Sequence, residues 1–141
     1  MNRIHISLRT PEPRTTAAFY EKLLGTPPDK VHDDYVRFAP EHLPLLLSLI
    51  PGEPGVDHLG VRHDDADGLA AHLATLGLTA SDEVVCCHAE KSEAWVHDPD
   101  GRSWEIYRVT DEAPERPSTD RTGCCPTTTT DASQADAGCC G

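Results

Sequence analysis

Alternating polar and apolar residues predict two similar strands, one near the N-terminus and one in the middle of the chain. The stretches His5–Arg9 and His58–Arg62 both read histidine, apolar, small, apolar, arginine. Alternation with period 2 is typical of a strand, and it places the histidine, the small residue and the arginine on one face and the apolar residues on the other. The sequence therefore predicts two equivalent strands that each begin with a histidine.

A helix is expected after each of these strands. The first should run from about Thr16 to Leu24, with Thr15 as its N-cap and Gly25 ending it. The second should begin near the carboxylates of residues 64–67. Its apolar stripe consists of Leu69, Leu73 and Leu76, and Gly77 ends it as Gly25 ends the first.

Further strands are expected after each helix. In the first half they are Tyr35–Ala39 and Leu43–Ile50, and the second of these is apolar enough to be buried on both faces. A turn-rich linker at residues 51–55 separates the halves. In the second half the expected strands are Val84–Val85, Ala94–His97 and Trp104–Tyr107, with residues 86–92 as a loop and a turn at 98–101.

The repeated order of strand, helix and strands indicates an internal duplication. Neither half could cover its own apolar face alone, so we predict an α+β fold in which two βαβββ modules pair side by side. The modules span about residues 1–53 and 54–110. They should form one curved mixed sheet with the helices outside and a polar cup inside. The sequence leaves open whether the modules pair within one chain or swap between the chains of a homodimer.

The last part of the chain has a different composition. From residue 111 to residue 141, Pro, Thr, Ser, Asp and Gly dominate and apolar residues are sparse, so a disordered tail is expected. The tail carries two further cysteine pairs, Cys124-Cys125 and Cys139-Cys140.

Charge and composition narrow the choice of partner. The 141-residue chain has a formal net charge of −12, which argues against nucleic acid or an anionic membrane surface as a partner. It has no apolar run long enough to span a membrane and no signal-peptide pattern at the N-terminus, so a cytoplasmic protein is expected. Its six cysteines are then expected to be thiols, and its partners to be small molecules, metals or other proteins.

The two histidines and a distant glutamate suggest a metal site. In the Trp104–Tyr107 strand, Glu105 and Tyr107 lie on the opposite face from the tryptophan and the isoleucine. If this strand joins those of His5 and His58, the three polar side chains form a 2-His-1-carboxylate ligand set.

A bound divalent ion would keep open positions at such a site. The first-half counterpart of Glu105 falls within residues 45–49, where Ser48 is the one polar residue, so a fourth protein ligand is missing. Open positions suit substrate or dioxygen at Fe(II), or water at Zn(II). The alternative is that these are ordinary polar residues on a solvated sheet face.

The adjacent pair Cys86 and Cys87 is a second candidate for chemistry. Thiolates bind soft atoms such as trivalent arsenic, Cd(II) or Hg(II), and from a loop both thiols could reach one atom. Lys91 and His88 would favour the thiolates electrostatically, and the nearby glutamates would oppose them. The alternative is a pair of half-buried thiols with no role.

Other polar residues are weaker candidates. Tyr107 could line a substrate-binding pocket or simply pack, and Arg9 and Arg62 could order carboxylates near the site or close the sheet by salt bridges. The remaining histidines are expected at the surface or in turns; they are His32, His42, His63, His72 and His97.

The combination of these features resembles a known superfamily. His5, His58 and Glu105 in paired βαβββ units resemble the vicinal oxygen chelate superfamily, which includes glyoxalase I, extradiol dioxygenases and fosfomycin-resistance thiol transferases. The resemblance covers about residues 1–110. The Phe19–Gly25 helix end, the Asp57–Val61 strand, the Cys86-Cys87 pair and Trp104–Tyr107 are together similar to organoarsenical carbon–arsenic lyases and cadmium-induced proteins.

The resemblance implies an Fe(II)-dependent, dioxygen-consuming enzyme that releases arsenite from trivalent organoarsenicals for arsenic detoxification. It implies that His5, His58 and Glu105 hold the metal. It further implies that Cys86 and Cys87 bind the arsenic of methylarsenite or an aromatic arsenite. Two alternatives remain open: another metal-dependent enzyme of this fold, and a protein that sequesters cadmium or arsenic through its thiols.

Overall fold

The structure, a computed structural model, describes residues 1–81, 84–86 and 89–111, with the backbone alone for 84–86. The elements in this part of the chain are, in order, β1 (Arg3–Thr10), α1 (Pro13–Leu24), β2 (Lys30–His32), β3 (Tyr35–Phe38), β4 (Leu45–Pro51), β5 (Gly55–Arg62), α2 (Ala66–Thr75), β6 (Val84–Cys86), β7 (Ala89–His97) and β8 (Ser103–Asp111). The predicted tail at 111–141 lies outside the described residues, apart from its first residue.

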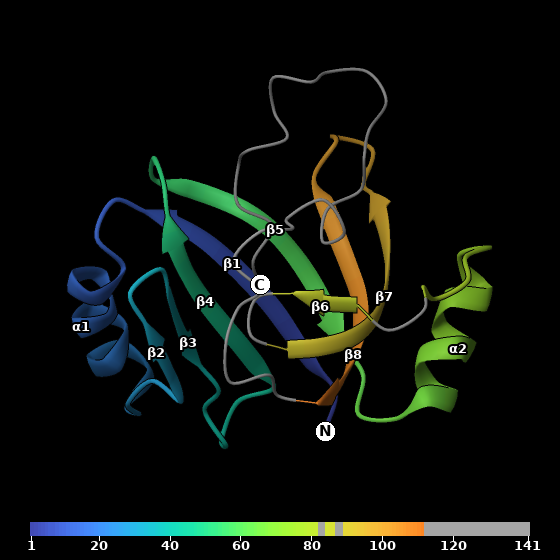
Figure 1. The fold of residues 1–141 in the computed structure, drawn as a ribbon, viewed down its shortest axis with the longest axis horizontal. Coiled ribbons are helices and arrows are strands. Elements are labelled where there is room, and N and C mark those ends of the chain that lie inside the picture. The colour runs from blue at the N-terminus through green and yellow to red at the C-terminus, as the bar shows by residue number, and fades with distance from the viewer. Residues whose placement is uncertain (82–83, 87–88, 112–141) are drawn as a thin grey trace.

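All the strands of the described chain join one curved sheet. Its order is β2-β3-β4-β1-β5-β8-β7-β6, and the two helices lie at opposite ends of it (Figure 1). The two halves meet where β1 and β5 pair antiparallel, and each of these strands pairs in parallel with the last strand of its own half, β4 or β8. This arrangement confirms the predicted α+β fold of two modules sharing a mixed sheet.

Each helix covers the apolar face of its own half. Ala17 and Leu24 of α1 pack with Phe38 and with alternate leucines of β4, and Leu69 and Leu73 of α2 pack on Ile106 of β8. The opposite face of the sheet carries the polar residues of the predicted cup. Because β4 lies between the helix layer and the cup, it is buried on both faces, as its apolar sequence predicted.

The helix boundaries agree with the sequence in part. Helix α1 begins at Pro13 rather than near Thr16, because proline lacks the backbone N–H that a first helical turn leaves unbonded. The predicted N-cap at Thr15 was therefore wrong: Thr15 lies inside the helix, and the capping position is Glu12, whose side chain makes no capping hydrogen bond. Its end at Gly25, in the left-handed region with φ 65°, is as predicted. For α2, the Oδ1 of Asp65 accepts a hydrogen bond from the backbone N–H of Gly68 at 2.6 Å, which confirms the predicted carboxylate cap.

Two local predictions were wrong. Strand β2 was missed, because a three-residue strand carries almost no periodicity. The expected loop at 86–92 is largely strand, since β6 extends to Cys86 and β7 begins at Ala89. The buried positions of β7 alternate Ala89, Lys91, Glu93, so its inward face is polar and gives no hydrophobic alternation.

One predicted surface histidine is also buried. His63 is 7% exposed, and its Nε2 lies 2.8 Å from Nδ1 of His72. Burial, followed by the neighbouring His72, lowers the pKa of His63 below its usual value. In the described part of the chain, no helix is long and apolar enough to cross a membrane.

Candidate metal centre

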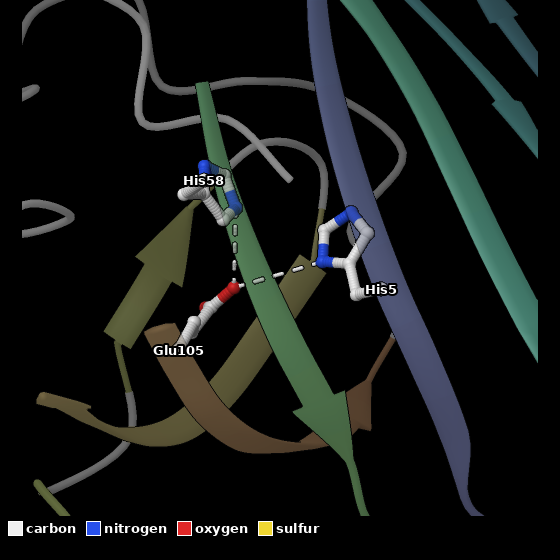
Figure 2. Close-up of side chains that lie close together, drawn as sticks. All are labelled: His5, His58 and Glu105. Carbon is white, nitrogen blue, oxygen red and sulfur yellow. Dashed lines mark ion pairs between the residues drawn. The ribbon is translucent and has the colours of Figure 1, made fainter. Parts of the chain in front are cut away.

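The sheet order brings three predicted ligands together. His5 lies on β1, His58 on β5 and Glu105 on β8, which are three neighbouring strands. Nε2 of His58 lies 3.6 Å from Oε2 of Glu105, and Nδ1 of His5 lies 3.9 Å from the same oxygen (Figure 2). The three side chains therefore converge on one point inside the cup.

Gly60 makes room for this convergence. It pairs with His5 on one side and with Glu105 on the other. A Cβ added at Gly60 would come within 2.8 Å of the Glu105 backbone oxygen and 3.3 Å of the His5 Cβ. The small residue of the repeated pattern is therefore needed at this position, because a Cβ there would clash with the Glu105 backbone and crowd the His5 side chain.

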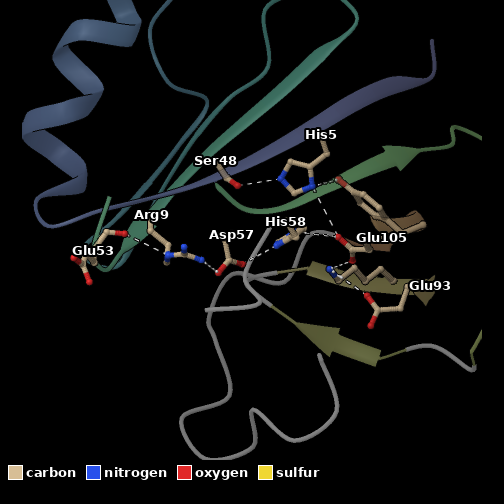
Figure 3. Close-up of polar contacts among 10 residues, drawn as sticks. His5, Arg9, Ser48, Glu53, Asp57, His58, Glu93 and Glu105 are labelled. Atoms are coloured by element: carbon tan, nitrogen blue, oxygen red, sulfur yellow. Dashed lines mark hydrogen bonds and ion pairs between the residues drawn. The ribbon is translucent and has the colours of Figure 1, made fainter. Parts of the chain in front are cut away.

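Hydrogen bonds hold the two imidazoles in different ways. Asp57 Oδ2 lies 2.8 Å from Nδ1 of His58, and Nε of Arg9 donates to the Glu53 carbonyl while its Nη1 donates to Asp57 (Figure 3). Arg9 of β1 thus contacts a carboxylate on β5, which fits both roles expected for it, ordering a carboxylate and linking strands by a salt bridge. This series of hydrogen bonds holds the His58 ring so that its Nε2 faces Glu105.

His5 is held at both ring nitrogens. Its Nε2 lies 3.0 Å from Oγ of Ser48, and its Nδ1 lies 3.2 Å from the hydroxyl of Tyr107. Tyr107 is thus in the cup, as predicted, but its hydroxyl contacts a ligand of the candidate site. An ion bound at Nδ1 of His5 would take the place of this hydrogen bond.

Lys91 and Glu93 were not predicted as parts of the site. The Lys91 ammonium forms an ion pair with Oε1 of Glu105 and lies 3.3 Å from Oε2 of Glu93. From the sequence, Lys91 falls in the expected loop at 86–92 and Glu93 directly after it, so both were expected near the cysteines rather than in the cup. Strand β7 instead turns them into the cup, where Lys91 is 1% exposed and Glu93 is 5% exposed.

Burial and charge shift the pKa values in opposite directions. Burial, followed by the proximity of His58, holds the pKa of His5 well below its usual value. For Glu105, burial alone would raise the pKa, but the Lys91 ammonium and His58 lower it below its usual value. Burial, followed by the Glu105 carboxylate, raises the pKa of Glu93 to about 8. The cup thus favours a neutral His5, an ionised Glu105 and a protonated Glu93.

The donor atoms fit a divalent metal ion. One ligand atom from each of His5, His58 and Glu105 lies within 4.8 Å of the others. Within the described residues, Nε2 of His58 and Oε2 of Glu105 are buried without a hydrogen-bond partner. Unpaired buried polar atoms are costly, and an ion with ligand bonds of about 2.1 Å could satisfy both after a small contraction. Two imidazoles and one carboxylate form the facial triad typical of non-haem Fe(II).

The cysteine pair falls at the edge of the described chain. The backbone of Cys86 ends β6 and pairs with Ala89 of β7. The side chain of Cys86 and the whole of Cys87 lie outside the described residues, as do the four cysteines of the tail. The predicted binding of a soft atom by these thiols stays a prediction.

Comparison with known proteins places the chain in a family. Residues 5–107 match a family described as a glyoxalase-like domain. The chain belongs to this family. Over 134 residues it is 37% identical to the trivalent organoarsenical cleaving enzyme of Thermomonospora curvata, covering 89% of each chain. It is also 33% identical over 117 residues to the cadmium-induced protein CadI of Mycobacterium tuberculosis, covering 77% of each.

Solved structures agree on the fold. This glyoxalase-like chain superposes on a glyoxalase/bleomycin resistance protein/dioxygenase superfamily member from Vibrio splendidus with a TM-score of 0.52 at 16% identity, covering 77% of this chain and 99% of that one. The comparison confirms the vicinal oxygen chelate fold that the resemblance implied. Together with the organoarsenical cleaving and cadmium-induced relatives, it confirms the resemblance inferred from the sequence.

Proposed function

We propose that this glyoxalase-like protein is a metal-dependent enzyme that cleaves the carbon–arsenic bond of trivalent organoarsenicals and releases arsenite, as part of arsenic detoxification. The observation that carries the proposal is the buried triad of His5, His58 and Glu105, in which two ligand atoms lack any other described partner. Relatives named as trivalent organoarsenical cleaving enzymes support the choice of substrate.

Fe(II) is the ion we propose for this centre, although the same donors would accept other divalent metals. When bound, Fe(II) would supply redox chemistry toward dioxygen, which is the second substrate in this proposal. The protein would hold the ion through two neutral imidazoles and one carboxylate, so that further positions stay free for reactants. Asp57 and Ser48 would keep the imidazoles in place through their hydrogen bonds.

Cys86 and Cys87 would bind the arsenic atom in this proposal. Trivalent arsenic is soft and binds thiolates, whereas the harder nitrogen and oxygen ligands suit iron. The backbone of Cys86 supports a position near the metal centre. It pairs with Ala89, which lies two residues before Lys91, and the Lys91 ammonium contacts Glu105. Holding the arsenical beside the metal would convert a bimolecular encounter into an oriented one.

The stoichiometry requires no further oxidant. Methylarsenous acid and one molecule of dioxygen contain the same atoms as arsenous acid and formaldehyde. The carbon–arsenic bond breaks, the methyl carbon is oxidised and dioxygen is reduced, while arsenic stays trivalent. An aryl substrate that yields a phenol would need an additional reductant, which makes methylarsenite the simpler test substrate.

The test loads the protein anaerobically with Fe(II), then adds oxygen and methylarsenite, and measures arsenite and formaldehyde. We expect equal amounts of the two products from the wild type and none from His58→Ala or from Cys86→Ser/Cys87→Ser. The matched controls are His97→Ala, an exposed histidine of β7, and Cys139→Ser/Cys140→Ser in the tail. Both controls should keep their turnover.

Two other functions would give different results. A thiol-based cadmium- or arsenic-binding protein, the alternative suggested by the relative named CadI, would bind methylarsenite through Cys86 and Cys87 without releasing arsenite. Another metal-dependent enzyme of the fold would keep its own activity after both cysteines are replaced. Retained arsenite release by His58→Ala would contradict the role proposed for the triad.

A further inference from the structure

The two carboxylate oxygens of Glu105 face different partners. Oε1 forms an ion pair with the Lys91 ammonium. Oε2 faces the two imidazoles, at 3.6 Å from Nε2 of His58 and 3.9 Å from Nδ1 of His5, and has no hydrogen-bond partner among the described residues. One oxygen is therefore occupied by the protein, and the other is directed at the candidate metal position.

Lys91 is itself held firmly in place. It is 1% exposed, and its Nζ lies 3.3 Å from Oε2 of Glu93 and 5.1 Å from the centre of the Tyr107 ring. A buried ammonium needs charged or polar partners, and here the Glu105 carboxylate, the Glu93 carboxyl group and an aromatic face supply them. Glu105 and Glu93, acting against burial, raise the pKa of Lys91 above its usual value. These contacts leave Lys91 little freedom to release Oε1.

We propose that Lys91 is a positioning residue that makes Glu105 a one-oxygen ligand of the metal. By occupying Oε1, its ammonium prevents the carboxylate from rotating both oxygens onto the ion. This inference rests on the metal centre of the proposed function and gives a role to a residue outside the triad.

The consequence concerns how many positions around the ion stay free. Two imidazoles and one carboxylate oxygen occupy three positions, whereas a carboxylate bound through both oxygens would occupy one more. Lys91 would therefore preserve one position for an exogenous ligand. What this task requires is a buried positive charge at Oε1, and the Lys91 ammonium supplies it.

The first experiment uses the wild-type protein loaded with Zn(II), which is redox-inert. Its crystal structure should show Oε2 of Glu105 on the ion and Nζ of Lys91 still on Oε1. A structure with both oxygens on the ion and Lys91 detached would overturn the inference. Failure of Zn(II) and Co(II) to bind would overturn it together with the proposed metal centre.

The second experiment compares Co(II)-loaded variants by visible absorption and azide titration. Lys91→Met should bind Co(II) but show weaker absorption, because a higher coordination number lowers its intensity, and its azide affinity should fall about tenfold. Lys91→Arg should restore both signals, because it returns a cation to Oε1. The matched control is Lys30→Met, a half-buried lysine of β2 at the far edge of the sheet.

The outcomes separate positioning from simple stabilisation. If Lys91 only stabilises the fold, Lys91→Met will lower the unfolding temperature while the Co(II) spectrum and azide affinity stay at wild-type values, and the inference fails. These experiments contain no arsenical, so the inference about Lys91 can fail even if the proposed carbon–arsenic cleavage is confirmed. If Lys91→Met does not fold, the Zn(II)-loaded wild-type structure decides the question alone.

Discussion

Ser48 and Glu105 occupy equivalent positions in the two halves of the chain. Ser48 of β4 pairs with the residue two places after His5, and Glu105 of β8 pairs with the residue two places after His58. The duplication therefore offers two places for a carboxylate, and a hydroxyl occupies one of them. The Ser48 hydroxyl contacts Nε2 of His5 and so orients a candidate metal ligand. The equivalent residue of the second half, Glu105, is itself a candidate ligand.

Replacing Ser48 by Ala should weaken metal binding without unfolding the protein. Loss of a hydrogen bond that orients a metal-ligating histidine typically costs about 10- to 100-fold in metal affinity. Its cost in the free energy of unfolding is about 1 kcal/mol. Competition between the protein and a chelator for Zn(II) measures the affinity. Ser92→Ala, a half-buried serine on the other face of β7, is the control, and an equal loss in both variants would contradict the role of Ser48.

Replacing Asp57 by Asn should disturb His58. Asp57 accepts from Arg9 and faces Nδ1 of His58, and its side chain is 5% exposed. An amide keeps the size but removes the charge, so we expect about 10- to 100-fold weaker metal binding. Isothermal titration with Zn(II) checks this, with Asp67→Asn on the exposed first turn of α2 as the control. Unchanged affinity in Asp57→Asn would show that the imidazole is held by packing alone.

Replacing Glu105 by Gln should both abolish metal binding and destabilise the metal-free fold. Lys91 would then remain buried with one carboxylate fewer, and breaking a buried ion pair typically costs about 3–5 kcal/mol. Adding Lys91→Met should recover much of this stability, because neither charge is then left without its partner, but it should not recover metal binding. Urea unfolding of the single and double variants measures the coupling, and strictly additive losses would contradict it.

Replacing Glu93 by Gln should change how stability depends on pH. Burial raises the pKa of Glu93 to about 8, so the folded protein binds a proton that the unfolded chain releases above its ordinary pKa. The wild type therefore loses stability as the pH rises from about 5 to about 8, whereas glutamine does not titrate.

Between about pH 5 and pH 8 the wild type should therefore lose at least about 1 kcal/mol of unfolding free energy relative to Glu93→Gln. The size follows from the raised pKa, because one pKa unit corresponds to about 1.4 kcal/mol. Urea unfolding of chelator-treated protein at the two pH values measures the shift. A difference that stays constant with pH would mean that Glu93 is ionised throughout.

The sequence by itself predicted the duplicated fold and the three residues that the structure brings together as a candidate metal site. His5 and His58 lie in strands with the same period-2 pattern, although both strands begin before the histidine, at Arg3 and Gly55. The pattern is local, so it can be recognised without knowing which strands pair. The helices were predictable in part, because capping residues and apolar stripes act within one element: the carboxylate cap of α2 is confirmed, and the cap expected at Thr15 of α1 is not. The position of Glu105 followed from the same alternation in β8.

Only the tertiary structure decided what surrounds the triad. Lys91 and Glu93 lie on a strand whose inward face is polar, so hydrophobic periodicity could not separate β7 from a loop. Their role depends on pairing with β8, which brings a buried ammonium to a carboxylate far along the chain. The local sequence pattern determines on which face of a strand a side chain lies. The pairing of strands distant in sequence determines which charged groups lie next to that side chain.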